Sequence, residues 1–199
     1  MKSVEAKHFA SFSGTYFFPA LKSLRLEFWN AFGVRIVSAI GKFLNAHHTI
    51  EDLQLGWGRV SGFRGFEWDL PEVDPEGFLP NLQSLDAHPI HLTFFATSYP
   101  SSLRNLKNLC LGVGDRTDSR CVIDMLEALK TIGGIPKLKR LVFDAWYHLY
   151  DKNFVSMMNE FAVLSPRLEF WEAQFEDPLA LVHSLLLYPI LPSLMFLLE

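Results

Sequence analysis

The glycine pairs Gly56-Trp-Gly58 and Gly112-Val-Gly114 have the composition of turns that could hold a phosphate group. A dinucleotide-binding fingerprint, however, needs a third glycine at the opening of a helix, and neither pair has one. Both pairs instead lie six and eight residues after Ile50 and Leu106, which begin two similar leucine-rich segments. The shared position indicates that these glycines serve the end of a strand, where a positive φ is useful.

The histidines and cysteines form no recognisable metal site. His47-His48 and His88-Pro-Ile-His91 are the closest pairs, but zinc takes four ligands, and no quartet with suitable spacing occurs. The two cysteines, Cys110 and Cys121, argue against a disulfide framework and favour a reducing compartment, the cytoplasm or the nucleus. No nucleophile elbow, zinc-protease or P-loop pattern is present. We therefore expect no enzyme, no cofactor and no metal; an enzyme with an unrecognised site is a remote alternative.

The composition is that of a globular chain without a strong charge. Its 199 residues are 49% hydrophobic and 20% charged, so the low hydrophobicity that is typical of disorder is absent. Lysine and arginine number 18 against 22 acidic residues, a net charge of -4 that gives no overall attraction to nucleic acid or to an anionic membrane. This length favours a single domain over residues 1–199.

A leucine pattern that recurs along the chain carries the fold prediction. Leu21, Leu24 and Leu26 form an L-x-x-L-x-L segment, and comparable segments begin at positions 50, 82, 106, 138, 168 and 194. The steps of 24 to 32 residues are typical of leucine-rich repeats or slightly longer. In five segments a proline stands two residues before the first leucine, where it can end a helix and start the turn into a strand. The pattern predicts strands near residues 23–28, 52–56, 84–88, 108–112, 140–144, 170–174 and 195–198.

The stretches between these strands carry hydrophobic residues at helical spacing. Residues 34–46, 121–132 and 151–164 show this spacing, and Asp177-Pro178 is a signal for the start of another helix. Strand, turn and helix in regular alternation predict an α/β fold, a leucine-rich-repeat solenoid (horseshoe) of about seven irregular repeats. We expect a parallel sheet on its concave face and mostly helices on its convex face.

Residues 59–78 interrupt this alternation, because they show no helical period. They hold five acidic residues and two arginines, a local charge of -3. We interpret them as an acidic irregular loop that replaces a helix. A solvated connector is the simpler alternative.

The segments F-P-A-L-K-S-L-R-L, L-P-N-L-Q-S-L and I-P-K-L-K-R-L, which start at Phe18, Leu79 and Ile135, resemble the leucine-rich-repeat region of fungal F-box-like proteins. The long irregular repeats, which lack the usual Asn or Cys after the strand, fit the same family. The likeness covers residues 18–199 and concerns the repeat module alone, with no F-box-like segment near Met1. It implies the substrate-recognition arm of a ubiquitin ligase receptor, which would meet the ligase adaptor through an upstream F-box. A free-standing repeat scaffold without a ligase connection is the alternative.

The strand pattern also predicts a binding surface. If Leu24 and Leu26 point into the core, strand alternation places their neighbours on the concave face. Over six strands that face holds five acidic residues and two arginines, and tryptophans follow three of the strands. Aromatic side chains beside charges are typical of protein interfaces. The predicted partner-binding residues are Arg25, Glu27, Trp29, Asp52, Gln54, Trp57, Asp86, His88, Arg140, Asp144, Trp146 and Glu172.

We expect the partner to be a protein or a peptide with a basic segment, because an acidic face repels the phosphates of nucleic acids. The alternative for the tryptophans is that they pack beneath the strand ends as part of the core. Residues 179–198 contain no charged side chain and are long enough to cross a bilayer. Two prolines interrupt them, and position 194 continues the leucine pattern, so we expect a repeat there, with a membrane anchor as the alternative.

Overall fold

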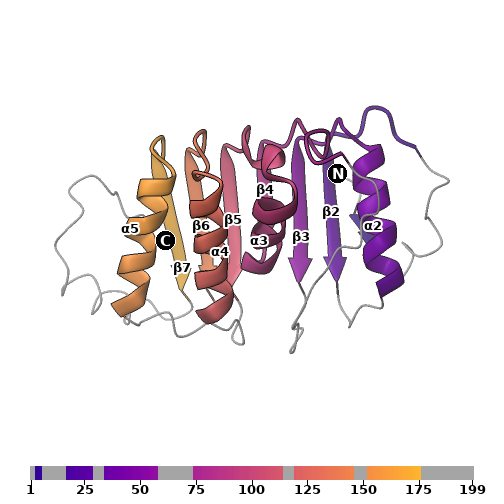
Figure 1. The fold of residues 1–199 in the computed structure, drawn as a ribbon. Coiled ribbons are helices and arrows are strands. Elements are labelled where there is room, and N and C mark those ends of the chain that lie inside the picture. The colour runs from indigo at the N-terminus through magenta and orange to yellow at the C-terminus, as the bar shows by residue number, and fades with distance from the viewer. Residues whose placement is uncertain are drawn as a thin grey trace.

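The computed structural model describes residues 3–5, 17–28, 34–57, 74–113, 119–145 and 152–175, and in these ranges strands alternate with helices (Figure 1). The strands are β1 (Ser3–Glu5), β2 (Ser23–Phe28), β3 (Asp52–Trp57), β4 (Ser84–Ala87), β5 (Asn108–Val113), β6 (Arg140–Ala145) and β7 (Phe170–Phe175). The helices are α2 (Val34–Ala46), α3 (Pro89–Ser98), α4 (Ser119–Thr131) and α5 (Lys152–Leu164), with a 3-10 helix, η1 (Pro100–Leu103).

The strands form one parallel sheet in which the order across the sheet is the order along the chain, from β1 to β7. Each strand pairs in parallel with the next one. Every connection therefore leads from the carboxyl end of one strand back to the amino end of the next. The middle leucines of the repeated segments occupy one row of this register: Leu24, Leu53, Leu85, Leu109 and Leu141, followed by Trp171. The α/β class with a parallel sheet is therefore confirmed.

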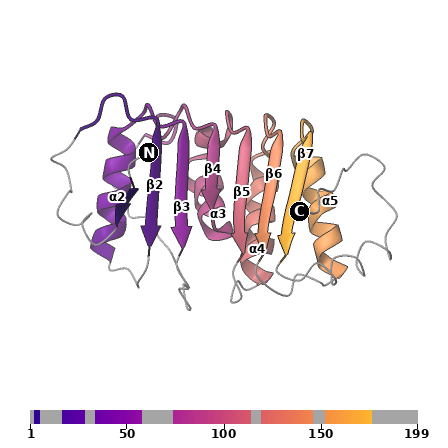
Figure 2. The same cartoon turned by 180° about the vertical axis from the view of Figure 1, so that it is seen from behind.

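The four α-helices of the described ranges cover one face of the sheet. They lie in front of the strands in Figure 1 and behind them in Figure 2, where the opposite face is turned to the viewer. No described helix lies over that opposite face, which we call the open face. Its described side chains are Ser23, Arg25, Asp52, Gln54, Ser84, Asp86, Asn108, Cys110, Arg140, Val142, Asp144, Phe170 and Glu172, with Gly56 and Gly112 between them.

The hydrophobic core lies between the sheet and the helices. Alternate strand residues point into it, because successive side chains of a strand lie on opposite faces. The helices supply residues at three- and four-residue spacing, the period of one helix face. The fully or almost fully buried residues include Leu26, Leu55, Leu111 and Phe143 from the strands and Ile40, Leu44, Leu92, Phe95, Met125, Leu129 and Phe161 from the helices.

Two backbone hydrogen-bond patterns recur at the entries to the strands, the first before β2 to β7 and the second before β3 to β7. In the first, the N–H of the segment's first leucine donates to a carbonyl three residues earlier, as at Leu21, Leu82 and Leu138. Pro19, Pro80, Pro136 and Pro166 stand at the second position of such turns, where the fixed φ of proline is favourable. In the second, one carbonyl accepts hydrogen bonds from the N–H groups of two consecutive residues at the entry to the next strand. These carbonyls belong to Lys22, Glu51, Gln83, Lys107 and Lys139. Each unit, meaning one strand with the segment that leads to the next strand, is thereby joined to its neighbour in the same way.

The sequence pattern does not predict three of the described elements: α3, the 3-10 helix η1 and β1. Helix α3 carries apolar residues on all its sides, so it has no hydrophobic stripe from which a period could be read. It begins at Pro89, so β4 ends at Ala87 and the expectation of a strand to residue 88 is wrong by one residue. Strand β1 has three residues and none of the leucine pattern.

Several expectations fall on residues outside the described ranges. They are residues 59–73 of the acidic loop, the helix expected at Asp177-Pro178, the strand expected at 195–198 and the anchor alternative for 179–198. Of the loop, residues 74–78 are described: Gly77 donates its N–H to the carbonyl of Asp74, and Phe78 is fully buried. None of the helices in the described part of the chain combines the length and the hydrophobicity that crossing a bilayer requires.

Candidate functional site

Strand pairing arranges the open face in rows that cross the sheet. One row joins Arg25, Gln54 and Asp86 on β2 to β4 with Cys110, Val142 and Glu172 on β5 to β7. A second row runs through Ser23, Asp52, Ser84, Asn108, Arg140 and Phe170. The parallel register thus collects side chains that lie far apart in the sequence on one surface.

The centre of the open face is acidic. Asp86 is half-buried, and burial is the main reason that its pKa is raised above the ordinary value. A hydrogen bond from Cys110 and the charge of Arg25 act in the opposite direction, whereas the charges of Asp144 and Asp52 raise the pKa of Asp86 further. Asp52 and Asp144 are therefore each close enough to Asp86 to repel its carboxylate, and we call these three residues the acidic centre.

Cys110 lies within the acidic centre and is not suited to nucleophilic chemistry. Burial, the charges of Asp86 and Asp144, and the hydrogen bond to Asp86 together raise the pKa of its thiol to about 12. The thiolate is the reactive form of cysteine, so this thiol stays protonated and unreactive at neutral pH. Its chemical contribution is the hydrogen bond that it donates to the Asp86 carboxylate.

The described positive charges of the open face are Arg25 on β2 and Arg140 on β6. Arg140 forms an ion pair with Glu172, with 3.3 Å between Nη2 and Oε2, and its guanidinium carbon lies 5.1 Å from the centre of the Phe170 ring. Arg25 is exposed on β2, and its charge lowers the pKa of Asp86, as the charge of Arg140 lowers the pKa of Cys110. The face therefore has arginines on β2 and β6 among carboxylates on β3, β4, β6 and β7.

A side-chain hydrogen bond joins two neighbouring strands of this face. The hydroxyl of Ser23 on β2 donates to the carboxylate of Asp52 on β3, with an O···O distance of 3.1 Å.

Strand β5 contributes small residues to this face. A Cβ atom added at Gly112 would find no heavy atom within 4 Å. Gly112 lies next to the last residue of β5, as expected, but it does not have a positive φ, so that part of the expectation is wrong. The open space above Gly112 is not readable from the sequence.

His88 and His91 hold the start of α3. The Nδ1 of His88 accepts a hydrogen bond from the N–H of Ile90, and the Nδ1 of His91 accepts one from the N–H of His88, both at 3.3 Å. Burial lowers the pKa of His88 to about 4, and burial together with His88 holds the pKa of His91 well below its ordinary value. Both rings are therefore neutral at pH 7, and His88 caps a helix beside the open face.

The other histidines have structural contacts as well. The Nε2 of His47 accepts a hydrogen bond from the N–H of Phe18 at 3.0 Å, and its Nδ1 donates to the carbonyl of Phe43 at 2.7 Å. His48 donates from Nδ1 to the carbonyl of Gly77 at 3.2 Å. Within the described ranges, no group of three or more His, Cys, Asp or Glu side chains could hold a metal ion.

Part of the predicted site lies beyond what the structure describes. Trp29 and Trp146 are outside the described ranges. The backbones of Glu27 and Trp57 belong to β2 and β3, but their side chains are not described. Their role in binding stays a prediction, as does the alternative that the tryptophans belong to the core.

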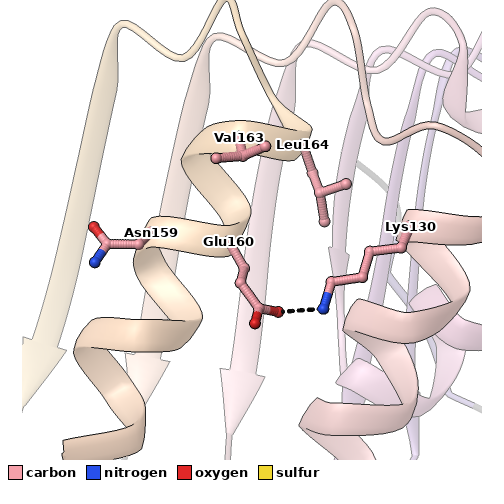
Figure 3. Close-up of a pocket in the computed structure, with 5 residues that line it drawn as sticks. All are labelled: Lys130, Asn159, Glu160, Val163 and Leu164. Atoms are coloured by element: carbon pink, nitrogen blue, oxygen red, sulfur yellow. Dashed lines mark ion pairs between the residues drawn. The ribbon is translucent and has the colours of Figure 1, made fainter.

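A shallow pocket lies on the other layer, between α4 and α5 (Figure 3). Lys130 of α4 reaches towards Glu160 of α5, and their ion pair measures 2.9 Å between Nζ and Oε2. Asn159, Val163 and Leu164 complete the lining. A half-exposed ion pair with apolar neighbours provides neither a nucleophile nor a general base, so this pocket is a weaker candidate than the open face.

Comparison with known proteins gives no relative from which a function could be transferred. The chain matches no protein-family model, and no curated protein is similar to it in sequence.

Proposed function

We propose that this chain is a leucine-rich-repeat solenoid, of the horseshoe type, that binds a protein or peptide on its open, concave face. The observation that carries the proposal is the acidic centre of a sheet face on which no described helix lies. One strand in each unit of 24 to 32 residues, joined to the next by the same hydrogen bonds, supports the repeat assignment.

Several features favour binding over catalysis. The thiol on the open face is protonated, and His88 and His91 are neutral and engaged at the start of α3. What the face offers is a surface of six paired strands, β2 to β7, with the carboxylates of the acidic centre and an aromatic ring beside Arg140. Such surfaces select partners through charge complementarity.

The charge of the acidic centre favours a partner with a basic segment. Asp86 is partly desolvated and lies near two further carboxylates. A cation from a partner would offset their mutual repulsion, whereas phosphate groups would add to it. A basic peptide segment is therefore the expected occupant, and a nucleic acid is not.

The test is to select peptides on the wild-type chain from a random dodecapeptide display library and to measure their affinity for two double variants. Asp52→Lys with Asp144→Lys reverses two charges on the open face. Asp124→Lys with Glu127→Lys is the matched control, because both residues are exposed on α4 in the helical layer. We expect Lys- and Arg-rich peptides that lose binding to the first variant and keep it with the second. Peptides without basic residues, or equal losses with both variants, would contradict the proposal.

The resemblance to fungal F-box-like proteins extends the proposal. We infer that the module is the substrate-recognition arm of a ubiquitin ligase receptor in the cytoplasm or the nucleus. The test is co-precipitation of the ligase adaptor with the full product of the gene, encoded from its mapped transcript start. Adaptor binding is the expected result. Its absence, while the open face still binds basic peptides, would favour a free-standing scaffold.

A further inference from the structure

We propose that the start of α3 is an acid-sensitive latch, which is closed while the rings of His88 and His91 are neutral and opens when either ring gains a proton. We call these two residues the histidine cap. The latch lies where β4 ends and α3 begins, two residues after Asp86 of the open face. Its opening would release the first turn of α3 beside that face, and this response to pH does not depend on what the face binds.

The histidine cap takes the place of the hydroxyl or carboxylate groups that usually hold the start of a helix. The Nδ1 of His88 accepts a hydrogen bond from the N–H of Ile90, and the Nδ1 of His91 accepts one from the N–H of His88, both at 3.3 Å. The two bonds are reciprocal, as in a capping box. The first turn of α3 contains no acidic residue, so two imidazole nitrogens serve as the side-chain acceptors at this helix end.

Both hydrogen bonds require an Nδ1 atom that carries no proton. A neutral imidazole has one acceptor nitrogen, whereas a protonated ring has two N–H donors and no acceptor. A proton on Nδ1 would therefore set an N–H group against the backbone N–H from which that nitrogen now accepts. It would also add a positive charge at the N-terminus of the helix, where the helix dipole disfavours cations. Each ring can thus hold the helix start only in its neutral form.

Burial makes protonation of the closed latch unfavourable. His91 is fully buried, and the two ring centres are 6.5 Å apart, so that a charge on His88 also acts on His91. Burial lowers the pKa of His88 to about 4 from an ordinary value of 6.5. A ring that is exposed to solvent by opening regains the ordinary value, so the open form binds protons more tightly than the closed form. A fall in pH therefore shifts the equilibrium towards the open form.

The charged and titratable groups on the described elements packed against α3 do not reverse this effect. Strand β4 carries Asp86, β5 carries Cys110, and η1 has no such group between Tyr99 and Arg104. Helix α4 carries Cys121 and the exposed side chains of Arg120, Asp124, Glu127 and Lys130. A carboxylate near His88 would favour its protonated form, and the pKa of His88 is nevertheless lowered. Burial therefore outweighs any attraction from Asp86.

The first experiment measures the hydrogen exchange of backbone amides by NMR in the wild-type chain at pH 7 and pH 5, corrected for the intrinsic effect of pH on exchange. The amides of His88 and Ile90 report on the latch, and those of Leu126 and Leu129 in α4 are the control. A pKa of about 4 in the closed form and 6.5 in the open form predicts that opening becomes about 20-fold more favourable at pH 5. We expect protection to fall by at least this factor at the latch and by less than about threefold in α4.

A cap that does not titrate tests the mechanism. His88→Asn combined with His91→Gln supplies amide oxygens at the N-cap and at the third helical position, where Asn and Gln are favourable. These oxygens can accept the same N–H groups at both pH values, so the pH dependence of exchange at the latch should disappear. His48→Asn is the matched control, because His48 is an exposed histidine outside the latch and its loss should leave that pH dependence unchanged. A double variant that keeps the wild-type pH dependence would overturn the latch.

The ring nitrogens provide a test that needs no variant. Nitrogen-15 chemical shifts of the imidazole rings distinguish a nitrogen that carries a proton from one that does not. At pH 7 the latch predicts Nδ1 without a proton and Nε2 with a proton in both His88 and His91. A proton on Nδ1 of either ring at pH 7, or equal protection of the His88 and Ile90 amides at pH 7 and pH 5, would overturn the inference.

Discussion

Replacing Gly134 by alanine should destabilise the protein far more than the same change at Gly133. Both glycines follow α4 with a positive φ, 79° at Gly133 and 86° at Gly134. A Cβ at Gly133 would meet nothing within 4 Å, whereas a Cβ at Gly134 would lie 2.0 Å from the backbone oxygen of Leu164, the last residue of α5. The difference between the two variants therefore measures the effect of the close contact between the backbone at Gly134 and the end of α5.

The magnitude follows from two contributions. Placing alanine in the left-handed region costs roughly 1–2 kcal/mol, and this applies to both variants. At Gly134 the clash also displaces the carbonyl of Leu164, which accepts a hydrogen bond from the N–H of Ile135 at 2.8 Å. Losing that bond costs about 1 kcal/mol, and moving a packed helix end costs about 1–3 kcal/mol more. We expect a loss of about 1–2 kcal/mol for Gly133→Ala and about 3–6 kcal/mol for Gly134→Ala.

Urea unfolding followed by circular dichroism measures both losses as changes in the free energy of unfolding. Gly112→Ala serves as the reference, since it is neutral or slightly stabilising where the added Cβ is free of contacts. Losses at Gly133 and Gly134 that agree within about 0.5 kcal/mol would refute the reasoning, because that difference is within the usual effect of a neutral substitution.

Three further predictions concern side chains of the described core and open face. His47→Ala should cost about 2–3 kcal/mol, because it removes the hydrogen bonds to Phe18 and Phe43 and the ring stacked on Phe43; a loss under about 1 kcal/mol in urea unfolding would contradict this role. Cys110 should resist iodoacetamide at pH 8, as read by mass spectrometry, and react faster in Asp86→Asn, because that change removes a charge and a hydrogen bond that raise its pKa. Because burial raises the pKa of Asp86 in the folded state, its ionisation costs stability above the ordinary value of 3.8. The melting temperature of Asp86→Asn should accordingly exceed that of wild type at pH 7, and the difference in melting temperature should shrink as the pH falls to 3.8. A difference in melting temperature that grows on acidification would contradict a raised pKa of Asp86.

Strands β2 to β7 were predictable because the repeated leucine pattern marks their buried side. Before β2, β4, β6 and β7 a proline marks the turn as a second, independent signal. Leu24, Leu53 and Leu85 consequently pair side by side in the sheet. Helix α2 also has the bounds that its hydrophobic period predicts, residues 34–46.

Other parts of the fold carry no local signal. Helix α3 has apolar residues on both its buried and its partly exposed sides, although Thr97 and Ser98 are exposed, so its sequence shows no hydrophobic period. His88 was expected to continue β4, but Pro89 starts a helix and the ring of His88 caps it. The contact of His47 with Phe18 joins residues 29 positions apart, which no local pattern reveals.

The candidate site was predictable in its composition but not in its geometry. Strand alternation places Asp52, Asp86 and Arg140 on the open face. It does not reveal that Arg140 is turned towards Glu172 or that space remains above Gly112, because both depend on packing between strands. The three tryptophans expected beside this face stay a prediction.

The most direct test of the central claim is to map a bound basic peptide on the protein by NMR. An arginine-containing dodecapeptide selected on the wild-type chain is titrated into isotope-labelled protein, and backbone amide shifts are followed. Binding on the open face predicts the largest shifts in β3 to β6, at residues such as Asp86, Cys110 and Asp144, with small shifts in the middle of α4. Shifts centred on α4 and α5, with β4 and β5 unchanged, would contradict it.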